Sequence, residues 1–226
     1  LKDRGFEVVE ILPEADGHLD VAKLAAEVDK NTVLVSCMAV NNETGTLQDI
    51  AALSTAVKAK NSRCAVHVDA VQAWLRIPID LKKWKNVDTL SVSGHKVHAP
   101  KGIGALFIRD SVRQTLCPPY LGGHQERGLR PGTEATAQIA GFARAVELRL
   151  AAGEALPRRL RELNSYAREK LSAIPGLQFI GDGQAPHILC VSLPGYPSGN
   201  IVSELDSQGI YISACLLYTS DAADDL

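Results

Sequence analysis

The sequence predicts an α/β fold, in which helices cover a mostly parallel sheet and a smaller α/β domain follows. Short apolar runs alternate with amphipathic runs through the first half, as in parallel strands joined by helices. Two long helical patterns then separate this half from a second group of short strands. With 226 residues, 46% of them hydrophobic, the chain can bury a sizeable core.

Each run in the first half has the length and residue types of one element. The two helical patterns cover 19–28, after an Asp16-Gly17 turn, and 49–60, with Asp49 as a plausible N-cap. The predicted strands are short and largely apolar, and lie at 7–12, 32–37, 64–68, 87–92 and 104–108. The last two are expected to pair antiparallel, because the linker between them carries no helical pattern.

The second half contains a different unit. Glycines and prolines mark residues 118–131 as a loop, and helical patterns over 134–152 and 157–173 meet near Gly153. The predicted small domain then consists of strands at 177–180, 187–193 and 210–213 and a helix at 198–207. We therefore expect a large domain over 1–150 and a partial small domain over 151–214.

Neither end of the chain looks like the native end of a domain. The first residues read as the end of a helix with Gly5 as its C-cap, so the large domain is expected to lack its N-terminal part. Residues 215–226 fit no predicted element and resemble translated sequencing-adaptor read-through. We expect them to be a non-native tail.

Composition excludes several classes of function. A net charge of −2 gives no reason to expect nucleic acid or an acidic membrane as partner. No apolar run approaches the ~18 residues of a membrane span, and no signal peptide is seen, so a cytoplasmic protein is expected. The five cysteines form no Cys-x-x-Cys pair, and His95 and His98 lack further ligands at metal spacing, so no metal site is predicted.

A lysine and an aspartate follow two of the predicted strands. Asp69 comes after 64–68, and Lys96 comes shortly after 87–92. Taken singly, Asp69 could be a helix cap and Lys96 a solvated loop residue. Open α/β sheets, however, bind ligands where the carboxyl ends of their strands meet. A lysine that can form an imine and a carboxylate that keeps a ring nitrogen protonated are what pyridoxal phosphate (PLP) requires.

Two amides could serve the same cofactor. Asn42 lies in the Asn-Asn-Glu-Thr-Gly stretch that follows strand 32–37, and its amide could donate to the phenolic oxygen of PLP. A plain Asn- and Gly-rich turn is the alternative. Gln72 lies three residues past Asp69 and can reach that oxygen if a helical turn begins there.

Taken together, these residues resemble the cysteine desulfurase and selenocysteine lyase family, the class V branch of fold-type I PLP enzymes. The resemblance implies the fold of a fold-type I PLP-dependent transferase from residue 1 to about residue 214. It also implies that Lys96 carries PLP and moves protons, that Asp69 pairs with the pyridinium nitrogen, and that Asn42 and Gln72 hold the phenolic oxygen. The matching stretches are 40–45, 67–72, 93–102 and 125–134.

The resemblance also implies a phosphate site and a dimer. Ser93 and His95 would bind the PLP phosphate, because a hydroxyl and an imidazole can donate to a dianion. Thr133 would reach the phosphate held by a partner subunit, so a homodimer is expected.

The implied activity of the parent protein is removal of sulfur from L-cysteine. L-alanine would leave, and a persulfide would remain on a mobile cysteine for an acceptor protein in Fe–S cluster or thio-cofactor synthesis. Ser213-Ala214-Cys215 imitates the end of the family's cysteine loop without its glycine, so Cys215 is either this nucleophile or part of the tail. The alternatives are a selenocysteine lyase, another class V enzyme such as an aminotransferase, and an inactive PLP-binding or dimerising remnant. Residues 1–226 alone are expected to be inactive.

Overall fold

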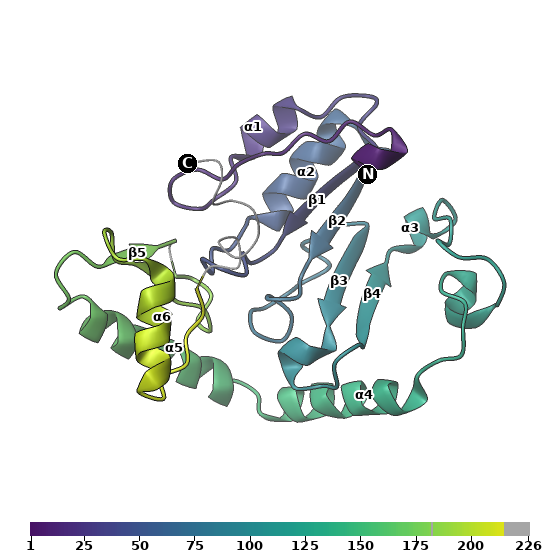
Figure 1. Cartoon of the computed structure of the whole chain (residues 1–226). Coiled ribbons are helices and arrows are strands. Elements are labelled where there is room, and N and C mark those ends of the chain that lie inside the picture. Colours follow the sequence, from purple (N-terminus) through teal and green to yellow (C-terminus); the bar gives the residue numbers. More distant parts are fainter. Residues whose placement is uncertain (182, 215–226) are drawn as a thin grey trace.

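The computed structural model describes residues 1–181 and 183–214, and its centre is a four-stranded sheet (Figure 1). The first three strands pair in parallel and the fourth pairs antiparallel with the third, as the sequence predicts. A mostly parallel α/β sheet is therefore confirmed. In sheet order the strands are β1 (Leu34–Met38), β2 (Ala65–Asp69), β3 (Thr89–Ser93) and β4 (Gly104–Ile108).

The predicted helices begin and end close to their predicted positions, and the short helix over Asp110–Arg113 was not predicted. Asp49 caps its helix by accepting the Ala52 N–H at 2.9 Å. The first helix begins later than the Asp16-Gly17 turn suggests, because Asp20 is its cap and accepts the N–H groups of Ala22 and Lys23. The helices are α1 (Val21–Ala26), α2 (Ile50–Lys60), α3 (Asp110–Arg113), α4 (Thr136–Ala151), α5 (Ala155–Leu171) and α6 (Ser198–Ser207), with 3₁₀ turns η1 (Lys2–Arg4), η2 (Gly94–Val97) and η3 (Gln125–Gly128).

The core lies between the sheet and the first two helices. Val66 and Val68 of β2 are fully buried together with Leu53 and Val57 of α2, and burial of such side chains is the main stabilising term. On this face Asp88 accepts the Val66 N–H at 2.8 Å and pairs with Lys58 at 2.6 Å. Both side chains of the ion pair are largely buried, so the pair ties α2 to the start of β3, and the Val66 hydrogen bond ties β2 to the same point.

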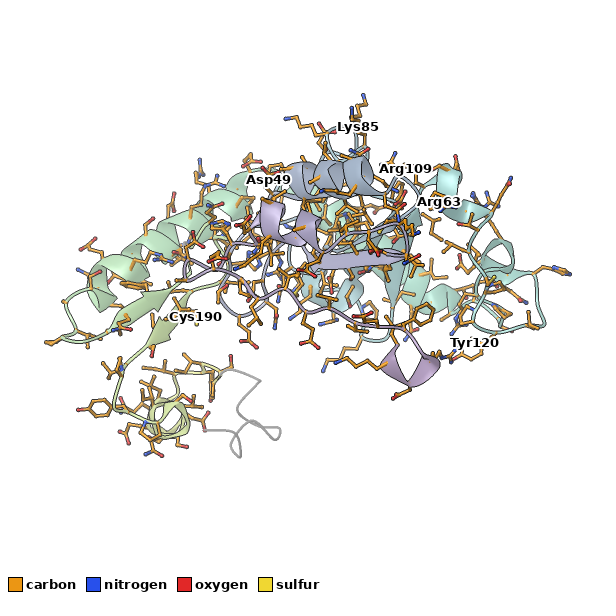
Figure 2. All side chains as sticks on the ribbon, turned by 90° about the horizontal axis from the view of Figure 1, so that it is seen from above. Asp49, Arg63, Lys85, Arg109, Tyr120 and Cys190 are labelled. Carbon is orange, nitrogen blue, oxygen red and sulfur yellow. The ribbon has the colours of Figure 1, made fainter. Side chains whose placement is uncertain are left out.

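A second, smaller unit follows the long helices. Its two strands, β5 (Gln178–Ile180) and β6 (Cys190–Ser192), pair antiparallel. Figures 1 and 2 both place this pair and α6 to one side of the four-stranded sheet, while α4 runs past the strand ends in Figure 1. The division into domains at residue 150 stays a prediction. None of the described helices is long and apolar enough to cross a membrane.

Two predicted strands are wrong. Residues 7–12 and 210–213 are extended or irregular chain without strand pairing. Most of their apolar residues are exposed, as Val9 at 53% and Leu12 at 76% show, although Ile11 packs against the core. A strand is stable only when its N–H and C=O groups pair with a neighbour, and the described chain offers these segments no neighbour. A short, largely apolar run favours extended chain but does not specify a pairing partner.

Candidate active site

Asp69 is the last residue of β2 and lies at the carboxyl edge of the parallel strands. It is in register with Met38 of β1 and Ser91 of β3, and the Ala39 N–H donates to its main-chain carbonyl at 2.8 Å. Its side-chain Oδ1 accepts the Val71 N–H at 2.9 Å. Within the described chain, Oδ2 makes no hydrogen bond, so one carboxylate oxygen of this half-buried residue is free to meet a ligand.

The chain after Asp69 makes the helical turn that the prediction for Gln72 required. Main-chain N–H groups of Ala73 and Trp74 both donate to the Ala70 carbonyl, at 2.9 and 2.8 Å. This turn buries Gln72, which is 7% exposed. Gln72 therefore lies within one turn of Asp69, as a shared ligand would require.

The two asparagines of the loop after β1 have different surroundings. Asn41 closes an Asx turn, because its Oδ1 accepts the N–H groups of Glu43 and Thr44 at 2.9 Å each. The turn is also closed by the Asn41 N–H, which donates to Thr46 O at 2.9 Å. Asn42 is exposed next to this turn, and its side chain has no such structural role. Of the pair, Asn42 is the one left to bind a ligand.

The two predicted phosphate ligands lie together after β3. Ser93 Oγ and His95 Nδ1 are 2.7 Å apart, at the start of η2. Gly94 between them packs so tightly that a Cβ would lie 2.9 Å from Ile103 Cγ2 and 3.0 Å from Ile103 O. The Gly94 N–H also donates to Ile103 O at 2.9 Å. The absence of a side chain at residue 94 thus allows the hydroxyl and the imidazole to meet.

Lys96 is half-buried in η2 and is held from two sides. Its main-chain carbonyl accepts a hydrogen bond from the Arg76 guanidinium, and α4 packs against η2. α4 also contacts the turn after β2, where the rings of Phe142 and Trp74 have centroids 5.5 Å apart, edge to face. The Lys96 side chain makes no hydrogen bond or ion pair with the described residues. Its amine is therefore uncommitted.

Gly94→Ala is expected to lower stability by about 1–3 kcal/mol, because the added methyl group has no room beside Ile103. It should also weaken PLP binding, because Ser93, His95 and Lys96 all depend on this turn. Chemical denaturation and PLP titration measure the two effects. Gly199→Ala in α6 is the matched control, because an added Cβ there meets nothing within 4 Å. Equal stability and equal PLP affinity in the two variants would contradict the packing argument.

The structure adds three residues near Lys96 that sequence reasoning missed: Arg76, Arg149 and His187. Burial, together with the charges of Arg76 and Lys96, lowers the pKa of His187 to about 4. Burial also lowers the pKa of Arg76, as does the charge of Arg149. Arg76 could have been found, because it follows Gln72 by four residues. Arg149 and His187 come from distant segments that carry no local motif.

The remaining predicted residues are not joined to this group. Thr133 is exposed in the loop that leads into α4. Cys215 and the predicted tail lie outside the described residues. No cluster of three His, Cys, Asp or Glu side chains that could hold a metal occurs within 1–181 and 183–214.

The donor set fits PLP. Lys96 has a free amine, Asp69 has a free carboxylate oxygen, and Ser93 and His95 offer paired donors for a phosphate. All lie at or just past the carboxyl ends of β2 and β3, where open α/β sheets bind ligands (Figure 1).

The chain belongs to the class V aminotransferase family, because residues 1–216 match the family model described as "Aminotransferase class-V". Class V aminotransferases and their NifS-like members are PLP-dependent enzymes. The resemblance predicted from the motifs is thus confirmed.

Known relatives of the chain include cysteine desulfurases. A cysteine desulfurase of Nostoc sp. is 37% identical over 99% of this chain and 56% of its own length. A solved NifS-like protein is 37% identical, with a TM-score of 0.87 over 95% of this chain and 58% of that one. The structure of SspA in complex with cysteine is 29% identical, with a TM-score of 0.73 over 99% and 59%. The chain therefore spans little more than half the length of these relatives.

Proposed function

We propose that this chain is part of a PLP-dependent cysteine desulfurase, which converts L-cysteine to L-alanine and keeps the sulfur as an enzyme persulfide. The activity is assigned to a parent protein of about the relatives' length. The observation that carries the proposal is the similarity to cysteine desulfurases along almost the whole chain. The free Lys96 amine and the free Asp69 oxygen at neighbouring strand ends agree with it.

Each site residue has a defined task in this reaction. Lys96 Nζ would hold PLP and then move the proton at the α-carbon of cysteine. Asp69 Oδ2 would keep the ring nitrogen protonated by a charge-assisted hydrogen bond. Asn42 and Gln72 would donate to the phenolic oxygen. When bound, PLP supplies the electron sink that makes the α-proton acidic.

The phosphate and the second subunit complete the proposed site. Ser93 and His95 would hold the PLP phosphate, and Thr133 would reach the phosphate in the partner subunit of a homodimer. A cysteine thiolate of the parent protein would attack the substrate sulfur, so that an S–S bond forms as the C–S bond breaks and alanine takes up a proton. Cys215 is one candidate for this thiolate. An acceptor protein in the cytoplasm would then take the sulfur.

The test is the product of the reaction. The parent protein with PLP, L-cysteine and a thiol reductant should release alanine and sulfide in equal amounts. Formation of 3-mercaptopyruvate without sulfide, or of pyruvate and ammonia with sulfide in place of alanine, would contradict the desulfurase and favour another PLP-dependent reaction. Faster release of selenide from selenocysteine than of sulfide from cysteine would favour a selenocysteine lyase.

Residues 1–226 alone should be inactive, as an inactive PLP-binding or dimerising remnant would be. They should release no more alanine than their Lys96→Ala variant. The measurement is alanine release from L-cysteine with saturating PLP. Alanine that appears in the unaltered chain and disappears on Cys215→Ala would show instead that Cys215 is the nucleophile.

A further inference from the structure

A cavity of about 140 Å³ lies beside Lys96, among η2, the turn after β2, α4 and α5. Five of its eight lining residues carry basic side chains, and none carries a carboxylate. Its volume gives room for more than one water molecule. The five basic residues come from four separate segments and are Arg76, Lys96, His98, Arg149 and His187.

The charges around this cavity are not neutralised by the described residues. Within the described chain, the Arg76 guanidinium makes one hydrogen bond, to the Lys96 carbonyl, and its other four donor hydrogens have no such partner. Neither Arg76 nor Arg149 joins an ion pair within the described chain. Other arginines of the same helices behave differently, since Arg144 pairs with Glu147 at 3.0 Å and Arg161 with Glu154 at 3.5 Å. The cavity therefore concentrates positive charge.

His187 adds an unsatisfied polar group to the wall. Both ring nitrogens are buried, and neither makes a hydrogen bond of normal geometry within the described chain. Burial and the charges of Arg76 and Lys96 lower the pKa of the His187 ring. The main-chain carbonyl of Gln72 acts in the opposite direction and raises this pKa, but by less. At neutral pH the imidazole is thus uncharged, with one N–H able to donate. Buried polar groups normally make hydrogen bonds, so the His187 ring is missing a hydrogen-bond partner that a ligand could supply.

We infer that this cavity binds a small tetrahedral oxyanion of the phosphate class, held by Arg76, Arg149 and His187. A guanidinium offers parallel N–H donors that match two oxygens of such an anion. The anion offsets the repulsion between the two arginines and accepts the hydrogen bond of His187. This site is separate from the Ser93–His95 pair, and its occupancy does not depend on the proposed function.

Titration of residues 1–226 with inorganic phosphate, followed by calorimetry or ³¹P NMR, tests the site. Saturable binding is expected, with the Kd raised at least fivefold by Arg149→Gln and by Arg76→Gln. Arg149→Gln is the cleaner variant, because the Arg149 side chain makes no hydrogen bond within the described chain, whereas the Arg76 side chain supports η2. Arg144→Gln is the matched control on the same helix and should leave the Kd unchanged. Absence of saturation in protein that circular dichroism shows to be folded, or an equal Kd in Arg149→Gln, would overturn the inference.

Two further readouts separate this site from the cofactor's. NMR titration of the His187 ring should show its pKa rise when phosphate is added, because an anion favours the charged imidazolium; an unmoved pKa would count against the site. Phosphate should also bind protein already loaded with PLP. Displacement of phosphate by PLP would assign the cavity to the cofactor and overturn the inference. Failure of PLP to bind would reject the proposed function while leaving the phosphate result intact.

Discussion

Replacement of Lys96 by alanine is expected to abolish alanine and sulfide production by the parent protein, with a loss of at least a thousandfold, about 4 kcal/mol of transition-state stabilisation. Lys96 would lose both its bond to PLP and its role in moving the α-proton. The amine is suited to this role, because it is half-buried next to the Arg76 contact and has no ion-pair partner among the described residues. Turnover with saturating PLP and L-cysteine measures the effect.

Lys101→Ala is the control for this result. Lys101 lies five residues further along the same loop and is exposed. Its replacement should leave turnover within about twofold of the unaltered protein. If Lys96→Ala kept substantial activity, or if both variants lost it equally, the assignment of the chemistry to Lys96 would be wrong.

Asp69→Asn is expected to lower turnover by at least tenfold, about 1.4 kcal/mol or more, with little change in folding. The asparagine keeps the shape of the side chain and can still accept the Val71 N–H, which donates to Oδ1 at 2.9 Å. It loses the negative charge that would hold the ring nitrogen protonated. The comparison requires equal PLP occupancy, read from the absorbance of the bound cofactor.

Asp80 provides a close control for that substitution. Its Oδ1 accepts the N–H two residues later, from Lys82 at 2.9 Å, in the same manner as Asp69. Asp80 is exposed outside the site, so Asp80→Asn should not alter turnover. Unchanged turnover in Asp69→Asn at matched occupancy would reject the role of the carboxylate.

The elements that the sequence predicts correctly are those set by local signals. Residues 49–60 have a capping aspartate and a helical pattern, and 64–68 have a short apolar run, so both appear within one residue of their predicted ends. The 7–12 and 210–213 segments have similar local signals but remain unpaired. Strand formation depends on a neighbour at any distance along the chain, which hydrophobic pattern alone does not reveal.

In the site, too, local sequence predicted some features, while others depend on distant segments. Asp69 and Gln72 share one turn, and Ser93, His95 and Lys96 share another, so sequence spacing alone grouped them. The surroundings of Lys96 were not predictable in this way. Arg149 comes from α4 and His187 from the segment before β6, and only the packing of the helices and the small unit against η2 brings them near. Residue roles within the site stay predictions.

The identity of the cofactor lysine is the most direct test of this account. Residues 1–226 and the parent protein should each be incubated with PLP, reduced with borohydride, digested and analysed by mass spectrometry. One major peptide is expected to carry the reduced cofactor, on Lys96, and no adduct is expected at this site in Lys96→Ala. A cofactor fixed mainly on another lysine, or an unchanged adduct in the Lys96→Ala variant, would contradict it.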